Sequence, residues 1–123
     1  MRVLVIEDDP ASRELATRVV AHAGHSVVTA ENGREGLRRA LGQRPELILL
    51  DLHLPDVAGW TVARELREQE AFRATPIIAL SAGSDEDRER ALEAGCSGFI
   101  SKPYEPAVLL AAVEQHVSAD AVL

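Results

Sequence analysis

Several residue types are scarce in this chain of 123 residues, and each scarcity excludes a class of protein. The single cysteine, Cys96, has no second cysteine with which to form an intrachain disulfide, so the chain needs no oxidising compartment and we expect it in the cytoplasm. Basic residues number 13 against 20 acidic ones, for a formal net charge of -7. Because direct binders of nucleic acids or anionic membranes carry the opposite balance, neither partner is expected.

Long hydrophobic runs are also lacking. The N-terminal run from Val3 to Ile6 ends at an acidic triplet and is too short for the hydrophobic region of a signal peptide. The run from Pro106 to Val113 falls far below the roughly 20 residues that cross a bilayer. Lysine is the rarest cation, since Lys102 is the only lysine among 13 basic residues. This exception indicates a position that needs a compact ammonium rather than a planar guanidinium.

Short apolar runs alternate with segments of helical periodicity along the whole chain. The run from Leu47 to Leu50 is apolar without alternation, which is typical of a strand buried on both faces of a parallel sheet. The expected strands are 2–6, 26–30, 46–51, 76–80 and 98–101, and the expected helices are 10–23, 34–41, 60–70, 85–94 and 106–117. The pattern predicts one α/β domain, a doubly wound, flavodoxin-like parallel sheet of five strands in the order 2-1-3-4-5.

Polar residues mark the ends and turns of these elements. Asp9 is the expected N-cap of the first helix, with Pro10 at its first position, and Gly42 and Pro45 are expected to end the second helix after Leu41. Ser84 and Asp87 form a capping-box-like pair at the start of a charged helix. We expect the charge run of that helix to be solvated.

Chemically active side chains follow four of the five predicted strands. They are Glu7, Asp8 and Asp9 after the first strand, Asp51 after the third, Ser81 after the fourth and Lys102 after the fifth. The carboxyl ends of parallel strands meet at one edge, where ligands bind in folds of this type. At ~4 Å and an effective dielectric constant of 20, each pair of like charges costs about 4 kcal/mol. One lysine does not offset this repulsion, so the cluster implies either a bound cation or a carboxylate with a raised pKa.

The nature of these groups suggests phosphoryl chemistry. Carboxylate oxygens suit Mg²⁺, which keeps several waters and often bridges to a phosphate. Asp51 is then a candidate nucleophile whose product is an acyl phosphate. Ser81 and Lys102 are suited to donate to the phosphoryl oxygens.

Four short motifs at these strand ends resemble the response-regulator receiver domain of two-component signalling. They are Val5-Ile6-Glu7-Asp8-Asp9, Leu50-Asp51-Leu52-His53-Leu54-Pro55 with Gly59, Ala79-Leu80-Ser81-Ala82, and Ser101-Lys102-Pro103. Each motif alone is weak, but four in the right order at the right strand ends are specific. The resemblance covers the chain from Val3 to about Val117.

The resemblance implies a role for each residue at the site. Asp51 corresponds to the phosphoacceptor, and Mg²⁺ is bound by the Asp8 and Asp51 carboxylates and by the backbone carbonyl of His53. Glu7 stands where Asp is commoner and acts through a metal-bound water. The side chain of His53 is expected to be an exposed loop residue.

Activation in the family uses three further positions. Ser81, in place of the commoner Thr, is the hydroxyl that follows the phosphoryl group, and Lys102 pairs with that group. The bond between Lys102 and Pro103 is expected to be cis. Phe99 replaces the commoner Tyr of the aromatic switch, so we expect packing in the core to be its main role and switching to be secondary.

The function implied is that of a stand-alone receiver. A histidine kinase or histidine phosphotransfer protein donates a phosphoryl group to Asp51 with Mg²⁺, and the signal leaves through onward phosphotransfer or through the surface of the fourth helix, fifth strand and fifth helix. With a receiver domain at 1–117 and a short tail at 118–123, no output domain is expected. The chain is then a self-phosphorylating phosphoacceptor, not an enzyme, although autophosphatase activity is compatible with the site.

Two alternatives stay open. A degenerate receiver would act as a constitutive protein-binding module, against which Asp8, Asp51 and Lys102 argue. A phosphohydrolase with an aspartate nucleophile, of the haloacid-dehalogenase type, would need a second acid where this chain has His53.

Overall fold

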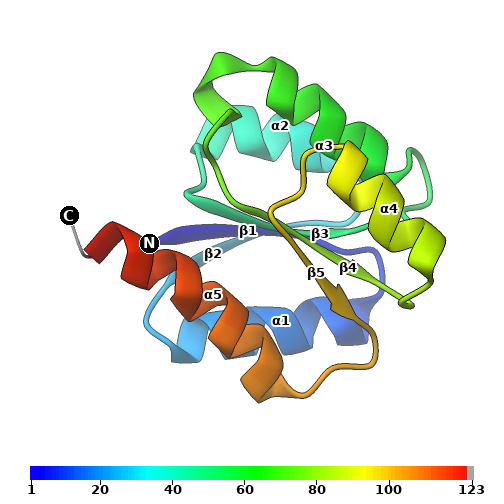
Figure 1. Ribbon diagram of the computed structural model, residues 1–123. Coiled ribbons are helices and arrows are strands. Elements are labelled where there is room, and N and C mark those ends of the chain that lie inside the picture. Colours follow the sequence, from blue (N-terminus) through cyan, green and yellow to red (C-terminus); the bar gives the residue numbers. More distant parts are fainter. Residues whose placement is uncertain (122–123) are drawn as a thin grey trace.

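A five-stranded parallel sheet forms the centre of the molecule (Figure 1). The computed structural model describes residues 1–121, with side chains described through residue 116. The strands are β1 (Arg2–Ile6), β2 (Ser26–Ala30), β3 (Leu47–Asp51), β4 (Ile77–Ser81) and β5 (Gly98–Ser101). Their order is β2-β1-β3-β4-β5, and every neighbouring pair is parallel, which confirms the predicted topology.

Helices cover both faces of the sheet. The helices are α1 (Pro10–His22), α2 (Gly33–Gln43), α3 (Gly59–Glu68), α4 (Asp85–Glu93) and α5 (Pro106–Ala121), and a short 3-10 helix, η1 (Glu70–Phe72), follows α3. Figure 1 shows α1 and α5 on one face and α2, α3 and α4 on the other. None of the helices in the described part of the chain is both long and apolar enough to cross a membrane.

Alternate side chains of the inner strands supply two separate apolar clusters. In β3, Ile48 and Leu50 pack with Val62 and Leu66 of α3, whereas Leu47 and Leu49 point to the opposite face. The second cluster is completed by Ala16 and Val20 of α1 and by Leu109 and Val113 of α5. Each fully buried large aliphatic side chain stabilises the fold by about 1.5–3 kcal/mol. The continuous apolar run of β3 is therefore explained by burial on both faces, as predicted.

Side-chain caps begin three of the helices. Asp9 accepts a hydrogen bond of 2.8 Å from the backbone N–H of Ser12, and Asn32 accepts one of 2.8 Å from the N–H of Glu35. The Ser84 hydroxyl oxygen accepts one of 3.0 Å from the N–H of Asp87. These bonds satisfy N–H groups that have no partner within the helix. The predicted capping role of Asp9 is confirmed.

All five helix ends differ from the sequence predictions by one to four residues, and the differences at α2 and α5 are the most informative. The prediction that α2 ends at Leu41, before Gly42, was wrong: the helix continues to Gln43, and Arg44, directly before Pro45, ends it in the left-handed region with φ 50°. The last helix was predicted to end at Val117, but α5 continues to Ala121, because no glycine or proline interrupts it. The division into a receiver domain at 1–117 and a tail at 118–123 stays a prediction, and residues 122–123 lie outside the described part.

Gly59 allows α3 to begin directly against the end of β3. A Cβ atom at this position would lie 2.3 Å from the carbonyl oxygen of Asp51 and 2.6 Å from the Cα of Leu52. The N–H of Gly59 donates a hydrogen bond of 2.9 Å to the carbonyl of Leu52. Only glycine fits this contact without moving the backbone that carries Asp51.

The substitution Gly59→Ala is therefore expected to destabilise the protein by about 2 kcal/mol or more, because the added methyl group meets backbone that has no room to move. Gly42→Ala is the matched control, since nothing lies within 4 Å of a Cβ atom at that helical position. Gly42→Ala should be neutral or stabilising by up to about 1 kcal/mol. Urea denaturation measures both, and equal midpoints for Gly59→Ala and the wild type would contradict the packing argument.

Candidate functional site

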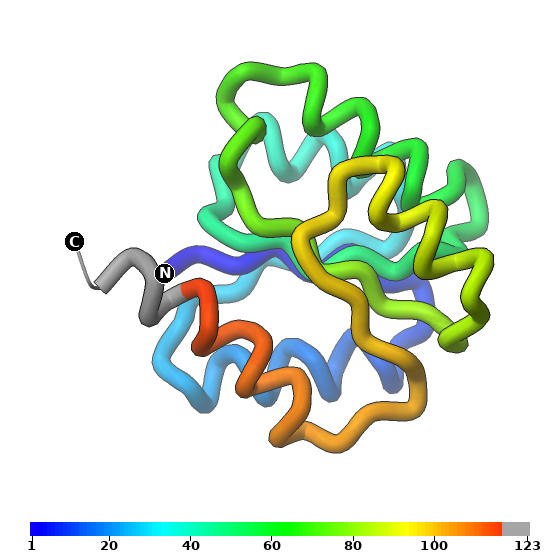
Figure 2. Tube along the Cα trace, viewed as in Figure 1, coloured from blue at the N-terminus to red at the C-terminus, as the bar shows by residue number. Residues whose placement is uncertain are grey.

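The polar residues that follow the strands gather at one edge of the sheet. The segments after β1, β4 and β5 lie together at this edge (Figures 1 and 2). The register pairs Ile6 of β1 with Leu50 of β3, so that Glu7 and Asp51 follow from neighbouring positions. Carboxylate oxygens of Glu7, Asp8 and Asp51 all lie within 4.8 Å of one another. Glu7 and Asp51 are buried, whereas Asp8 is exposed at the open side of the cluster.

The ammonium of Lys102 lies between the two buried acids. Its Nζ atom donates to Oε1 of Glu7 and lies 3.7 Å from Oδ2 of Asp51. Burial alone would lower the pKa of Lys102, but the hydrogen bond to Glu7 and the charge of Asp51 outweigh it and raise that pKa above its usual value. The peptide bond between Lys102 and Pro103 is cis, as expected. The lysine therefore stays charged and pairs mainly with Glu7.

Burial and the excess of negative charge in the cluster change the pKa of Asp51. Burial and, after it, the neighbouring Glu7 raise its pKa, the His53 N–H and the Lys102 charge lower it, and the net result is a rise from 3.8 to about 7. The N–H of His53 donates a hydrogen bond of 3.1 Å to Oδ1 of Asp51. Near neutral pH the carboxyl group is therefore poised between its protonated and ionised forms. This is one of the two outcomes that the strand-end cluster predicted.

The same cluster fits a divalent cation. Three carboxylates supply hard oxygen ligands, and only one lysine opposes their charge. Because Lys102 is engaged mainly by Glu7, Asp8 has no ion pair with it, and a cation beside Asp8 and Asp51 would compensate both. The donor set therefore suits Mg²⁺, which takes few protein ligands and keeps its waters.

The Ser81 hydroxyl donates its hydrogen bond to a residue that was not predicted to belong to the site. Its partner is Oδ2 of Asp87 on α4, and both side chains are buried, with 1% of Ser81 and 6% of Asp87 exposed. Burial would raise the pKa of Asp87, but the hydrogen bonds from Ser81 and His53 outweigh it and hold that pKa below its usual value. The expectation that the whole charge run of α4 is solvated was wrong at Asp87.

His53 is an exposed loop residue, as expected, but its side chain also contacts the site. Half of its side chain is exposed, but Nε2 lies 2.7 Å from the same Oδ2 atom of Asp87, and the ring contacts Trp60 edge-on at 5.9 Å between centroids. This exposed loop residue therefore contacts both Asp87 of α4 and Trp60 of α3. The capping box identified Asp87 only through its backbone N–H, and no sequence pattern links it to Ser81 and His53.

Phe99 packs as expected. The ring is half-buried against the cluster that contains Leu50 and Ala79, and the guanidinium of Arg88 lies 5.0 Å from its centroid. A role as an aromatic switch stays a prediction. Cys96 is buried, and burial raises the pKa of its thiol to about 11, so it remains a neutral packing residue at neutral pH.

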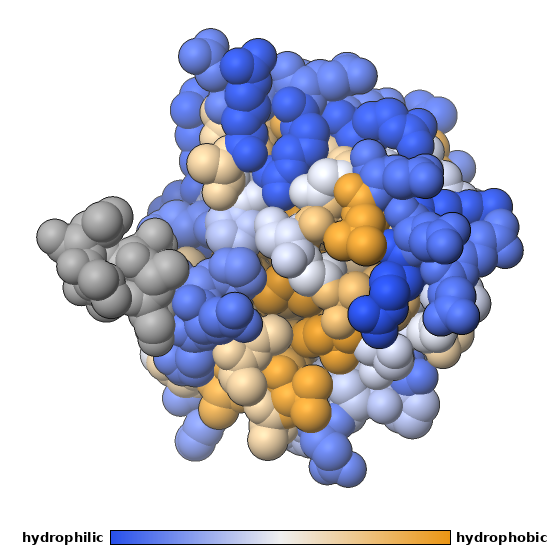
Figure 3. Space-filling view, in the orientation of Figure 1, coloured by the Kyte–Doolittle hydropathy of each residue, from blue (hydrophilic) through white to orange (hydrophobic). Residues whose placement is uncertain are grey.

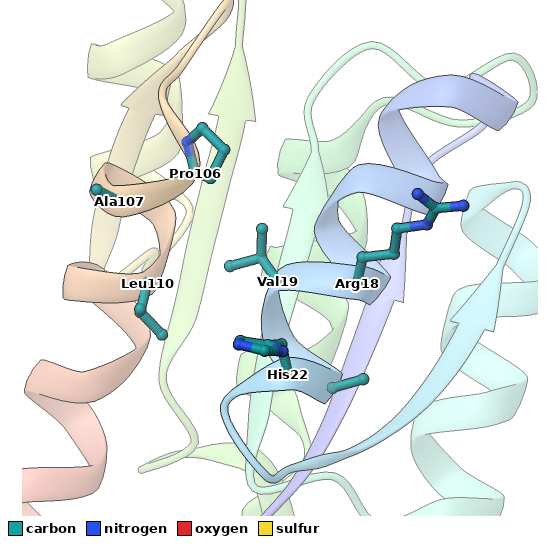
Figure 4. A pocket seen from close by; sticks show the side chains of 7 residues that line it. Arg18, Val19, His22, Pro106, Ala107 and Leu110 are labelled. Atoms are coloured by element: carbon teal, nitrogen blue, oxygen red, sulfur yellow. The ribbon is translucent and has the colours of Figure 1, made fainter.

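Two hollows lie near this region, and only one of them touches the site. A pocket of about 310 Å³ is lined by Ser12, Leu15, Ala82, Lys102, Pro103 and Tyr104, and so opens beside the lysine. A groove of about 810 Å³ lies between α1 and α5, where Val19, His22 and Leu110 face one another (Figure 4). No residue predicted for the site lines that larger groove.

Comparison with known proteins agrees with this geometry. The family model of the response regulator receiver domain matches residues 3–114. This chain belongs to that family. The matched span contains all of the sheet except Arg2, the first residue of β1, and every residue of the strand-end cluster. Receiver domains are phosphoacceptors rather than enzymes, bind Mg²⁺ in an acidic pocket, and interact with histidine kinases or phosphotransfer proteins.

Relatives of this receiver are found in both long and short proteins. The transcriptional regulatory protein CusR of Escherichia coli is 40% identical over 114 residues, which are 92% of this chain and 49% of CusR. The chain thus spans about half the length of that relative. The polar-differentiation response regulator DivK of Brucella anthropi is 35% identical over 102 residues, which are 82% of this chain and 83% of DivK.

A solved receiver structure shows the same fold. The receiver domain of the sensor histidine kinase PA1611 from Pseudomonas aeruginosa, crystallised with a magnesium ion in its active site cleft, is 33% identical. Its TM-score is 0.88, over 95% of this chain and 97% of that one. The comparisons favour neither the phosphohydrolase nor the constitutive binding module.

The pKa of Asp51 has a consequence for stability. Between pH 3.8 and about 7 the folded protein binds more protons at this residue than the unfolded chain does, so stability falls as the pH rises through this range. Asp51→Asn carries no such proton. In metal-free buffer the variant should be more stable than the wild type at pH 8 by roughly 2–4 kcal/mol, and the difference should shrink towards pH 5.

Thermal melting at several pH values measures this difference. Glu114→Gln is the control, because it removes one negative charge at an exposed position of α5. A difference between Asp51→Asn and the wild type that does not vary with pH would contradict the raised pKa.

Proposed function

We propose that this receiver accepts a phosphoryl group on Asp51 from a phosphohistidine donor, in a reaction that needs Mg²⁺. The observation that carries the proposal is the placement of Asp51 at the end of β3, buried within 4.8 Å of two other carboxylates and 3.7 Å from Lys102. A structural carboxylate at such a position would be neutralised by its neighbours. Here the neighbours leave an excess of negative charge that a cation would balance.

In this proposal the metal is held by Asp8, Asp51 and the backbone carbonyl of His53, with Glu7 acting through a metal-bound water. Bound Mg²⁺ would neutralise charge on the phosphoryl oxygens during transfer. Asp51 must be ionised to attack, and a cation beside it favours the ionised form of a group with a pKa of about 7.

The transfer itself is a displacement at phosphorus. An oxygen of Asp51 bonds to phosphorus as the phosphorus–nitrogen bond of the donor breaks, and the electron pair of that bond returns to the imidazole nitrogen. Lys102, which already lies near Asp51, pairs with the new phosphoryl group, and the Ser81 hydroxyl donates to one of its oxygens. Attack of water on the acyl phosphate would reverse the modification, which is the autophosphatase activity that we include in the proposal.

We further propose that the signal leaves through the face formed by α4, β5 and α5. The guanidinium of Arg88 on α4 lies over the ring of Phe99 on β5, so a movement of α4 would change the contacts on this face. Figure 3 shows apolar side chains gathered where β5 and α5 run, and Val108 of α5 is 49% exposed. A protein partner in the cytoplasm, contacted there, or onward phosphotransfer would then provide the output.

Intact-mass measurement after incubation with acetyl phosphate and Mg²⁺ tests the proposal. One phosphoryl group, labile to alkali, is expected on the wild type. It should be absent from Asp51→Asn and from samples in which a chelator removes the metal. No adduct from acetyl phosphate, from a cognate phosphohistidine donor or from beryllofluoride would show that Asp51 is not a phosphoacceptor.

A further inference from the structure

A chain of hydrogen bonds joins β4, α4 and the loop after β3 beside the phosphoacceptor. Oδ2 of Asp87 accepts from the Ser81 hydroxyl and lies 2.7 Å from Nε2 of His53. Because an ionised carboxylate only accepts, Nε2 of His53 carries the hydrogen of its bond. One carboxylate oxygen therefore receives two donors, and both come from residues next to the site of phosphorylation.

A serine hydroxyl has one hydrogen to donate. In this structure that hydrogen is given to Asp87. In the proposed function the same hydrogen is needed by a phosphoryl oxygen on Asp51. The two bonds are mutually exclusive, so Ser81 must leave Asp87 before it can act on the phosphoryl group.

We propose that Asp87 is a positioning residue that binds the Ser81 hydroxyl in the resting state and thereby opposes occupation of the phosphorylated state. This inference rests on the proposed function, because it assigns Asp51 as the acceptor and Ser81 as a donor to the phosphoryl group. It adds a residue of α4 that acts through Ser81 and does not touch the phosphoryl group itself.

The position of Asp87 is fixed by its surroundings. Its N–H is capped by the Ser84 hydroxyl oxygen at 3.0 Å, and its side chain is 8% exposed. The turn that leads from Ser81 to Ser84 contains Gly83 with φ +93°, where a Cβ atom would meet Oγ of Ser101 at 2.8 Å. The loop that leads into α4 therefore lies close to the end of β5, and the Ser84 cap fixes the start of the helix that carries the Asp87 carboxylate.

The bond to Ser81 can break without leaving Asp87 unpaired. His53 stays within 2.7 Å of the carboxylate, and the carboxylate remains in the first turn of α4, where the helix dipole favours a negative charge. The arrangement thus suits a reversible change of partner by Ser81. It also gives α4 a contact that is lost on phosphorylation, next to the Arg88 side chain that covers Phe99.

Titration with beryllofluoride and Mg²⁺, a probe that mimics the phosphoryl group, tests the inference. Asp87→Asn keeps the shape of the side chain but weakens its bond to Ser81 by removing the charge. We expect this variant to be half-saturated at about tenfold lower beryllofluoride than the wild type, a factor that corresponds to 1.4 kcal/mol. Bound probe is counted by fluorine NMR, with Asp51→Asn as the blank.

Two further variants separate positioning from a general effect of charge or folding. Asp85→Asn removes an equal charge from the same first turn of α4 at an exposed position, and its half-saturation should match that of the wild type. In the Ser81→Ala background, Asp87→Asn should change half-saturation by less than twofold. An unchanged midpoint for Asp87→Asn, or the same shift with and without the Ser81 hydroxyl, would overturn the inference.

Hydrogen exchange of the unliganded protein provides a test that does not depend on probe binding or on the folding of Asp87→Asn. Ser81→Ala should speed exchange at the backbone amides of Asp87 and Arg88 by severalfold, because α4 loses the same contact. Equal exchange in Ser81→Ala and the wild type would contradict the inference. A wild type that binds no beryllofluoride would instead contradict the proposed function and leave the exchange comparison to decide the Ser81–Asp87 contact.

Discussion

Repulsion among carboxylates at the end of a parallel sheet is the constraint on which this site depends. The fold brings Glu7, Asp8 and Asp51 together because β1 and β3 are neighbours and run in the same direction. Lys102 compensates mainly Glu7, and burial then raises the pKa of Asp51 to about 7. The stability that the apolar clusters provide on both faces of the sheet allows the domain to carry this unfavourable group, which is also the group best placed for chemistry.

The site is connected to the surface through α4. Asp87, which is buried, accepts the hydrogen bond of Ser81. The exposed residues Arg88 and Arg90 place their guanidinium carbons 5.0 Å from the ring centroid of Phe99 and 4.7 Å from that of Trp60, respectively. A change in the partner of one serine hydroxyl can therefore alter the contacts of a whole helix. Coupling of this kind needs two arrangements of similar free energy, and hydrogen bonds that exchange partners supply them.

Most of the fold could be predicted from short-range patterns. Continuous apolar runs marked the buried strands, and Asp9 and Ser84 marked helix starts, because burial and capping depend on neighbouring residues. Helix ends were predicted less well. Gly42 did not end α2, because a glycine ends a helix only where the chain must enter the left-handed region, and here that residue is Arg44.

The sequence by itself determined the parallel sheet and the gathering of Asp8, Asp51, Ser81 and Lys102, because parallel strands place every residue after a carboxyl end at one edge. Only the tertiary structure decided which hydrogen-bond and ion-pair partners these side chains have. Lys102 pairs mainly with Glu7, and Ser81 donates to Asp87 beside His53. Which hydrogen bond forms depends on differences of a few tenths of an ångström in the distances between side chains from elements far apart in the chain. No local pattern of residues encodes such differences.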